Sequence, residues 1–306
     1  MPDLHRTTGR WRLGVGLALV TTTIWGLLAM ALKVLVVKLD PFTVTWIRFV
    51  GAGCLMLVVG RHGRIPSPRH APGPYALLLV ATCGIAGNFV LFLAGLRLTS
   101  PATAQLVSQL APLFLMAGSM VVFGERFQRL QWVGLASLVG GLLLYFGERT
   151  AEMTNGLHGT LGGVLLIGAG AASWTAYALA QKQLLRDFTP DFVLAFVYLA
   201  GSLLLLPPAQ PHLLLAQSWP RLGLLVATIV VTLVSYRCFS GALQHLEGSR
   251  VGVVISLTPL ITLVGVTVAS SFLPDWVQPE RLGAAGLAGA LLVVAGSALT
   301  ALARRT

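Results

Sequence analysis

Residues 24–41 read IWGLLAMALKVLVVKLDP, and the pattern returns 149 positions later in residues 173–190, which read SWTAYALAQKQLLRDFTP. A Trp, a Lys eight positions after it and a Pro eight positions after that occur in both stretches, although both are otherwise strongly apolar. Further matching residues follow at nearly the same spacing: Pro112 with Pro259, and Gly134 with Gly283. The sequence therefore predicts two copies of one unit, in residues 1–150 and 151–306.

The composition predicts that this chain is embedded in a lipid bilayer. Hydrophobic residues make up 56% of it, charged residues only 10%, and the mean hydropathy is +0.82, whereas a soluble protein carries about 25% charged residues. A helix needs about 20 apolar residues to cross a bilayer. We count ten such segments: 13–37, 41–60, 75–96, 99–123, 131–147, 159–182, 189–207, 219–243, 248–272 and 282–302. The expected fold is an all-α membrane protein with ten transmembrane helices.

The positions of the basic residues predict the orientation. If the N-terminus is cytoplasmic, 13 of the 21 Lys and Arg residues fall inside and five outside, with Lys33, Arg48 and Arg237 within spans. Because basic residues are enriched on the cytoplasmic side, we expect both termini there. Five helices per half is an odd number, so the second half must enter the membrane upside down. Two inverted five-helix repeats around a central cavity are the plan of many transporters.

Motifs in both halves resemble a known family. The run Ile24-Trp25-Gly26, followed by Lys33, Pro41 and Arg48, is similar to the opening of EamA-type members of the drug/metabolite transporter superfamily. Later runs strengthen the resemblance: Ala94-Gly95-Leu96, Pro101-Ala102, Leu110-Ala111-Pro112 and Gly124-Glu125-Arg126. The second half departs from the pattern, with Ser270-Ser271-Phe272 in place of Gly-Glu-Arg and Val197 opposite Arg48. The resemblance implies ten helices, a central cavity and export of small metabolites.

Polar residues in the fourth segment share one helix face. Gln105, Ser108, Gln109 and Pro112 follow the spacing i, i+3, i+4, i+7. Two amides and a hydroxyl embedded in lipid need partners, so they either line a substrate cavity, which we favour, or hold helices together. Pro112 would also free a backbone carbonyl. The equivalent residues of the ninth segment are assigned the same role: Ser256, Thr258 and Pro259.

Aromatic residues at depth are the next candidates. Trp25 lies about 20 Å along the helix axis from Arg12, at about 1.5 Å per residue, which is too deep for an interfacial aromatic belt. We expect Trp25 and its repeat mate Trp174 to line the cavity, with Tyr177 on a neighbouring face. The alternative is ordinary anchoring at the membrane interface.

Charged and amide groups within spans are functional candidates by default. Lys33 lies near the end of its segment and either contacts substrate or extends its charged group outward. Arg48 either contacts substrate or binds backbone carbonyls. Arg237 has no acidic neighbour in its own segment, and Tyr236 beside it joins the candidates together with Asn88.

The positions of the acidic residues favour one class of substrate. Every Asp and Glu falls in a loop or at a helix end, so the predicted chamber is positive and free of acid. We therefore expect transport of zwitterionic or anionic metabolites, with amino acids as the first candidates, by alternating access. Proton coupling through a buried acid lacks a candidate, which favours facilitated diffusion or exchange. The alternative is efflux of lipophilic or cationic toxic compounds, and a lipid or lipid-linked sugar is a further option.

Other classes of function have little support in the sequence. An intramembrane enzyme would need clustered metal ligands or a base-activated nucleophile, and the spans contain neither pattern. We expect no enzyme activity, no cofactor, no metal and no nucleic-acid partner. The expected partners are a small-molecule substrate and the lipid bilayer, with the chain acting as a monomer in the inner membrane.

Overall fold

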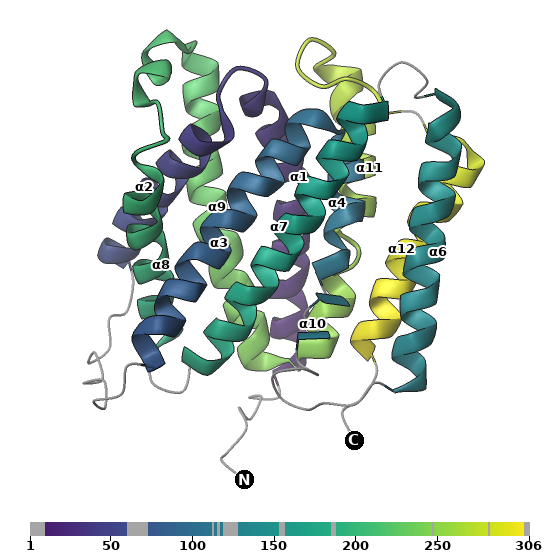
Figure 1. Cartoon of the computed structure of the whole chain (residues 1–306), viewed down its shortest axis with the longest axis horizontal. Coiled ribbons are helices and arrows are strands. Elements are labelled where there is room, and N and C mark those ends of the chain that lie inside the picture. Colours follow the sequence, from purple (N-terminus) through teal and green to yellow (C-terminus); the bar gives the residue numbers. More distant parts are fainter. Residues whose placement is uncertain are drawn as a thin grey trace.

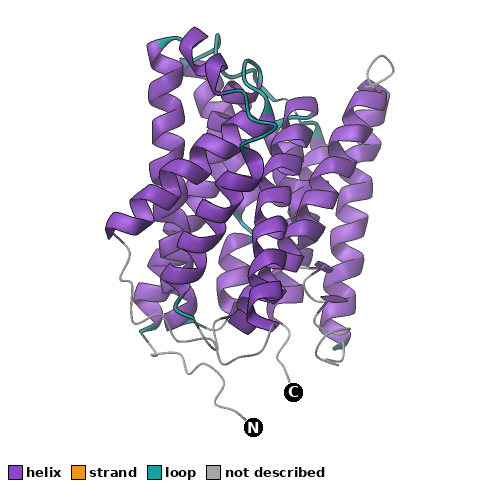
Figure 2. Ribbon diagram, turned by 60° about the vertical axis from the view of Figure 1, so that its left-hand side comes forward, coloured by secondary structure: helices purple, strands orange, loops and turns teal. Residues whose placement is uncertain are grey.

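The computed structural model describes residues 10–59, 73–111, 113–114, 117–118, 128–152, 157–184, 188–246, 248–280 and 282–302. Within these ranges the chain is helical and contains no strand. The helices lie lengthwise beside one another, with most connections at the two ends of the bundle (Figure 2). The elements labelled in Figure 1, together with the 3₁₀ helix η1, are α1 (Trp11–Val36), α2 (Pro41–Val59), α3 (Gly73–Leu98), α4 (Pro101–Ser108), α6 (Arg129–Glu152), α7 (Leu157–Leu184), α8 (Pro190–Leu205), η1 (Pro211–Ala216), α9 (Trp219–His245), α10 (Gly248–Ile255), α11 (Thr258–Phe272) and α12 (Ala284–Leu302).

Local sequence explains where several helices begin. Asp40 stands before α2, and its carboxylate accepts a hydrogen bond from the backbone N of Thr43 at 2.9 Å. Ser100 stands before α4 and accepts one from the backbone N of Thr103 at 3.2 Å, and Thr189 plays the same part before α8. A proline follows each of these residues. Side-chain oxygens satisfy the free N–H groups of a first turn, and proline has no N–H there to satisfy.

The apolar helices match most of the predicted spans. Seven described stretches are long and apolar enough to cross a membrane, one of them Arg250–Phe272, which contains most of α10 and all of α11, and Pro190–Leu205 and Ala284–Thr300 are shorter apolar helices. These nine correspond to nine of the ten predicted segments. The remaining segment, 99–123, is described only in part, through α4 and a few residues after it. The count of ten therefore stays a prediction.

Helices are interrupted at equivalent positions of the two repeats. α4 ends at Ser108, with Gln109 in a turn, and α10 ends at Ile255, three residues before α11 begins at Thr258. The spacing of 147 residues between Ser108 and Ile255 is that of the sequence repeat. The ninth predicted segment, 248–272, is thus two consecutive helices.

Proline explains the second interruption. Pro259 has no N–H, so the carbonyl of Ile255 loses its helical hydrogen bond. The hydroxyl of Thr258 donates to that carbonyl instead, at 2.5 Å. The equivalent proline of the first half, Pro112, lies outside the described residues.

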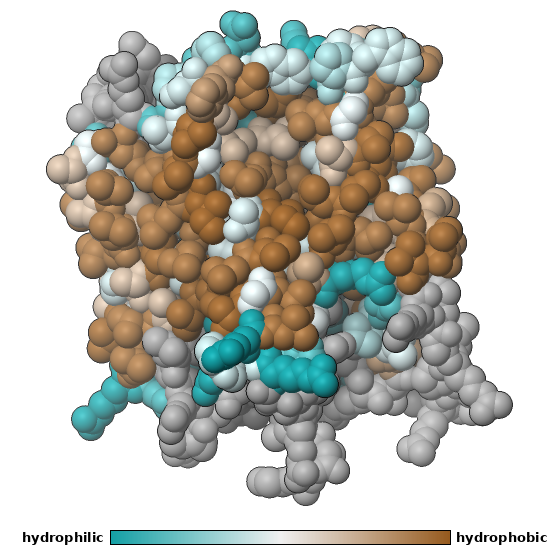
Figure 3. All heavy atoms as spheres, turned by 180° about the vertical axis from the view of Figure 1, so that it is seen from behind, coloured by the Kyte–Doolittle hydropathy of each residue, from teal (hydrophilic) through white to brown (hydrophobic). Residues whose placement is uncertain are grey.

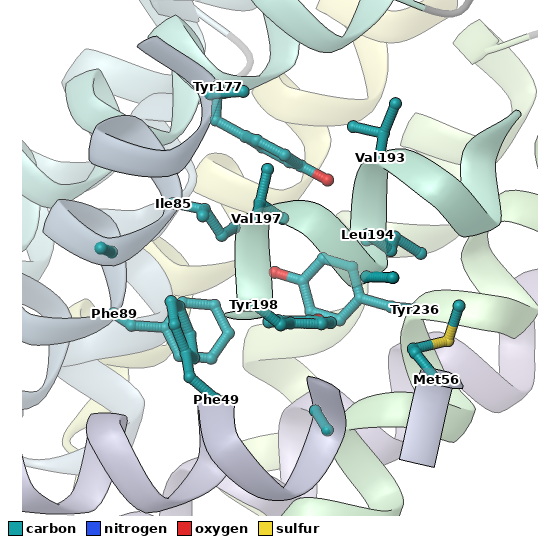
Figure 4. Packing of buried hydrophobic residues seen from close by; sticks show 14 of the residues in the cluster. Phe49, Met56, Ile85, Phe89, Tyr177, Val193, Leu194, Val197, Tyr198 and Tyr236 are labelled. Atoms are coloured by element: carbon teal, nitrogen blue, oxygen red, sulfur yellow. The ribbon is translucent and has the colours of Figure 1, made fainter. Parts of the chain in front are cut away.

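Each helix of the first half packs most extensively on a helix of the second half. The pairs are α1 with α9, α2 with α8, α3 with α7, α4 with α11, and α6 with α12. The hydrophobic core between them includes rings and aliphatic side chains from α2, α3, α7, α8 and α9 (Figure 4). The outer surface carries a broad apolar band, with hydrophilic residues gathered at the two ends (Figure 3). A surface of this kind suits a lipid environment.

The two ends of the bundle are distinguished by the elements they hold. We call the end where α1 begins and α12 ends the near end (Figure 1). The opposite end is the far end, where α1 ends, α3 turns into α4, and the loop between α11 and α12 lies against them. The described parts of the first and last helices thus start and finish at the same end, as expected if both termini lie on one side of the membrane.

Glycines allow α6 and α12 to approach closely. A Cβ atom added to Gly141 would lie 2.7 Å from the carbonyl O of Gly289 and 2.7 Å from the backbone N of Val293. Backbone atoms cannot rotate away from such a clash. Small residues at helix contacts are characteristic of membrane proteins, in which packing rather than the hydrophobic effect holds helices together.

This contact yields a matched pair of substitutions. We expect Gly141→Ala to lower stability by about 1–3 kcal/mol, because the methyl group forces the two helices apart. A Cβ atom on the adjacent Gly140 would meet nothing within 4 Å, so Gly140→Ala should be neutral or stabilise by up to about 1 kcal/mol. Thermal unfolding of the purified variants in detergent measures both. Equal melting temperatures for the two variants would contradict the proposed close contact.

Candidate functional site

Trp25 lies near the middle of α1 and contacts two other helices, α9 and α4. Its indole Nε1 donates to Ser235 Oγ of α9 at 3.0 Å. Its backbone carbonyl accepts a hydrogen bond from Gln105 Nε2 of α4 at 3.0 Å. Its ring lies 5.6 Å, centroid to centroid, from the rings of Tyr236 and Phe239. The prediction that Trp25 sits deep in the bundle is consistent with these contacts.

The next residue, Gly26, brings α11 to the same place. Its carbonyl accepts a hydrogen bond from Thr262 Oγ1 at 2.9 Å, and a Cβ atom on Gly26 would lie 2.8 Å from Cγ2 of Ile261. Polar groups inside a membrane must be satisfied within the protein. The carbonyls of Trp25 and Gly26 therefore accept hydrogen bonds from side chains of α4 and α11. α4 ends at the first interruption, and α11 begins just after the second.

The three polar residues predicted to share a face of α4 have separate partners. Gln105 bonds α1, as described above. Ser108 donates to the carbonyl of Ala104 in its own helix at 2.8 Å. Gln109 accepts from Ser297 Oγ of α12 at 2.7 Å. Gln105 and Gln109 thus connect helices, as in the alternative interpretation, and a role of these residues in substrate binding stays a prediction.

The repeat-equivalent residues lie at the interruption before α11. Ser256, Thr258 and Pro259 are all buried. Ser256 donates to the carbonyl of Val253 at 2.7 Å, and Thr258 bonds the carbonyl freed by Pro259. Their hydroxyl groups thus satisfy the broken helix itself.

Arg48 is the most unusual of the predicted residues. It is only 3% exposed, and its Nη2 donates to Thr232 Oγ1 of α9 at 2.7 Å. Its guanidinium carbon lies 4.7 Å from the centre of the Phe89 ring, within the range of a cation–π interaction. The guanidinium Nε is buried without a hydrogen-bond partner, and so is the hydroxyl of Tyr198.

Aromatic rings surround this arginine. Phe49 contacts Phe89 and Tyr198 at centroid distances of 5.0 and 5.2 Å. Tyr236 lies 6.3 Å from both Phe89 and Tyr198, and Tyr236 in turn contacts Trp25. Figure 4 shows these rings gathered between α2, α3, α8 and α9. A continuous set of aromatic contacts thus connects the Trp25 region with Arg48.

Two other predicted residues make hydrogen bonds between α3 and a neighbouring helix. The amide of Asn88 donates to the carbonyl of Gly170 in α7 at 2.9 Å. Lys33 donates from Nζ to the carbonyls of Leu96, Arg97 and Thr99, at 2.8, 3.0 and 2.6 Å. Lys33 thus binds the C-terminal end of α3, where the helix dipole favours a cation.

Trp174 and Tyr177 of α7 belong to the aromatic core. Tyr177 is buried within it, and the partly buried Trp174 packs against it. The expectation that these rings line a substrate cavity is not settled by this packing and stays a prediction.

Two of the predicted cations, Arg237 and Lys33, have acidic residues beside them at the ends of the bundle. Arg237 pairs with Asp191 of α8, Nη2 to Oδ2, at 3.4 Å, and Glu280 lies close enough to Lys33 for electrostatic attraction. Both carboxylates were placed correctly, in a helix end and a loop, but the fold brings these segments back over the cations. Arg48 differs, because no carboxylate partner is found for it in the part of the chain that the structure describes.

A cavity of about 580 Å³ opens at the far end. Its lining residues come from α1, the α3–α4 turn and the α11–α12 loop: Met30, Lys33, Val34, Val37, Thr99, Ser100, Pro101, Trp276, Val277, Gln278, Pro279 and Glu280. Of these, the sequence singled out Lys33 alone. A signal was available in the loop, where Trp276, Gln278 and Glu280 stand close together between two apolar segments.

Apolar helices of membrane-spanning length, joined through buried polar contacts, define an integral membrane protein with many spans. A family model described as the EamA-like transporter family matches residues 12–147 and again residues 161–302. The chain belongs to this family, and it is a membrane transporter rather than an enzyme. The two matched segments correspond to the two halves seen in the sequence repeat.

Individual relatives agree with this assignment. The chain is 33% identical over 300 residues to the "Uncharacterized inner membrane transporter YhbE" of Escherichia coli K12, covering 96% of this chain and 92% of that protein. It is 27% identical over 296 residues to a Salmonella typhimurium protein named "Probable amino-acid metabolite efflux pump", covering 92% of each. A solved crystal structure at 21% sequence identity shares the fold, with a TM-score of 0.63 over 97% of this chain and 100% of the other.

The contacts of Trp25 predict its importance for transport. Trp25→Ala removes the bond to Ser235 and the ring contacts, so we expect at least a tenfold loss of flux per folded molecule, with a smaller effect on expression. The matched control is Trp11→Ala, because Trp11 is 57% exposed at the near end of the same helix. Flux in proteoliposomes, normalised to protein that elutes as a single species, measures the effect. Equal transport by the two variants would remove Trp25 from the transport pathway.

Proposed function

We propose that this protein exports small metabolites that carry a carboxylate group, with amino acids as the first candidates. Transport proceeds by alternating access between two inverted five-helix halves, residues 1–150 and 151–306. Family membership supports transport, and the relative named as an amino-acid metabolite efflux pump supports the substrate class. The observation that carries the substrate class is the positive charge of Arg48, for which the described residues provide no carboxylate partner.

The physical argument starts from the surroundings of Arg48. A buried donor without a partner costs about 1–3 kcal/mol, and a charged group in the membrane interior is normally retained for function. Phe89 and Thr232 stabilise the guanidinium group without neutralising it. A carboxylate could neutralise the charge and accept hydrogen bonds from the free Nε and from the Tyr198 hydroxyl. A cationic compound would instead be repelled.

Packing across the halves supports alternating access. Every described helix of the first half has its main partner in the second, and the interruptions of α4 and α10–α11 fall at repeat-equivalent positions. Discontinuous helices at matching positions of two repeats are characteristic of substrate sites in secondary transporters. The hydrogen bonds from Gln105 and Thr262 link these interrupted helices to Trp25 and Gly26. Movement of one half relative to the other would therefore shift or break these bonds.

The proposed orientation places the near end in the cytoplasm and the protein in the inner membrane. Arg10, Arg12, Arg129 and Arg250 stand at the near-end starts of α1, α6 and α10. Basic residues next to spans are retained on the cytoplasmic side. The far-end cavity then faces the periplasm, toward which an exporter releases its substrate.

Substitution of Arg48 tests the proposed function. Arg48→Met should reduce flux of a transported amino acid at least tenfold, because the carboxylate loses its counter-charge, and Arg48→Lys should retain part of it. The control is Arg12→Met, which removes an exposed charge at the near end. Proteoliposomes loaded with a mixture of amino acids, organic anions or ethidium report which class moves.

Two outcomes would contradict the proposal. Undiminished amino-acid flux in folded Arg48→Met protein would show that the arginine is structural. Flux of ethidium without flux of any carboxylate by the wild-type protein would instead assign efflux of lipophilic cations.

A further inference from the structure

The far-end cavity has a cation and an anion in its lining. Lys33 of α1 contributes an ammonium group, and Glu280 of the α11–α12 loop contributes a carboxylate. The other lining residues include apolar Met30 and Val34, the ring of Trp276, and polar Thr99, Ser100 and Gln278. The volume of about 580 Å³ falls within the range of about 300–1,000 Å³ that is usual for small-molecule sites.

Helix ends hold both charges in place. Lys33 binds three carbonyls at the C-terminal end of α3. Glu280 binds the other side of the same turn, where it accepts hydrogen bonds from the hydroxyl of Ser100 and from the backbone N of Ala102, at 3.3 Å for the latter. The hydroxyl of Tyr145 donates to Glu280 at 3.4 Å. A cation at a helix C-terminus and an anion at a helix N-terminus are each stabilised by the helix dipole.

The charges in the lining bear on which ligands the cavity could accept. Among the described lining residues the charged groups are one cation and one anion, which together carry no net charge. A ligand with a single charge meets one group that attracts it and one that repels it, whereas a zwitterion can place each of its charges beside the opposite one. The ammonium of such a ligand can join or replace the hydroxyl donors on Glu280, and its carboxylate lies beside Lys33.

We propose that the far-end cavity is a binding site for small zwitterions with an apolar side chain, such as aliphatic amino acids. Glu280 recognises the ammonium group, Lys33 attracts the carboxylate, and the side chain lies against Met30, Val34 and Trp276. The inference rests on the proposed function, because the zwitterion bound here is taken to be the exported substrate. The cavity is the release-side site, separate from Arg48.

Three probes with one side chain test the charge preference. L-leucine is zwitterionic, N-acetyl-L-leucine is an anion, and L-leucinamide is a cation at slightly acid pH. Isothermal titration calorimetry on the full chain in detergent should give wild-type affinity for leucine about tenfold above that for the other two. Glu280→Gln should lower the affinity for leucine about tenfold, because its ammonium group loses its partner. The same change should raise the affinity for N-acetyl-leucine, because the negative charge that repels this anion is removed. Lys33→Met should raise the affinity for leucinamide, because the positive charge that repels this cation is removed.

Nearby charges provide matched controls. Asp275→Asn and Lys38→Met remove exposed charges close to the cavity in the sequence and should leave the ranking of the three probes unchanged. The ranking is a ratio within one variant, so a partly unfolded variant still reports it. Repeating the titrations in Arg48→Met protein separates the far-end cavity from the central cation, and the ranking should persist there.

The outcomes separate this inference from the proposed function. Absence of leucine binding, or the same ranking in the Glu280 and Lys33 variants as in wild type, overturns the far-end site. Loss of the ranking in Arg48→Met protein does so too, because the binding would then belong to Arg48. Charge-dependent binding at the far end in a protein that transports no carboxylate overturns the proposed function alone.

Discussion

Hydrogen bonds to the carbonyls of Trp25 and Gly26 are the constraint around which the described bundle is organised. A membrane gives no water to satisfy polar groups, so Gln105 and Thr262 must find acceptors inside the protein. They find them on adjacent residues of α1, and the Trp25 indole binds Ser235 beside them. Because Gly26 has no side chain, α11 can come close enough for its hydroxyl to reach. Three elements distant in sequence are thereby fixed to one short segment of α1.

The distribution of charge follows a different rule at the centre and at the ends. At the ends, loops and first turns supply acids, so Lys33 and Arg237 each have a carboxylate nearby. At the centre, the described side chains around Arg48 are aromatic rings and hydroxyls. Rings and hydroxyls stabilise a cation without cancelling its charge. The positive potential is therefore concentrated at Arg48, rather than spread through the interior as the composition suggested.

The sequence predicted the positions of the helices well but not the contacts between them, because the signals for a helix are local and those contacts join residues far apart in the chain. Apolar length and the Asp40, Ser100 and Thr189 caps are local features, so nine spans and several helix starts could be placed. The depth of Trp25 followed from helical rise alone. Its bond to Ser235 joins residues 210 positions apart, and no periodicity within one helix can indicate such a contact.

The acidic neighbours of Arg237 and Lys33 were missed for the same reason. Asp191 and Glu280 were correctly placed outside the helix centres, but their distance in space from Arg237 and Lys33 depends on how segments fold over the helix ends. The hydroxyl of Thr258 shows the opposite case. Proline chemistry indicates that a carbonyl will be freed, and the residue beside the proline supplies its donor.

The electrostatic profile along the proposed pathway bears on the direction of transport. A carboxylate moving from the near end would pass the Arg237–Asp191 pair and reach Arg48, which has no carboxylate partner among the described residues. It would then meet Lys33 and Glu280 at the far end. Paired charges at both ends add little net potential, so the favourable position for an anion lies at the centre and is reachable from either side. A profile with its minimum in the middle does not itself drive flow one way. Net export must then follow from the substrate gradient or a coupled solute. In the proposed pathway, Arg48 is the central charge that would bind a carboxylate, and the paired charges at the ends would let it leave.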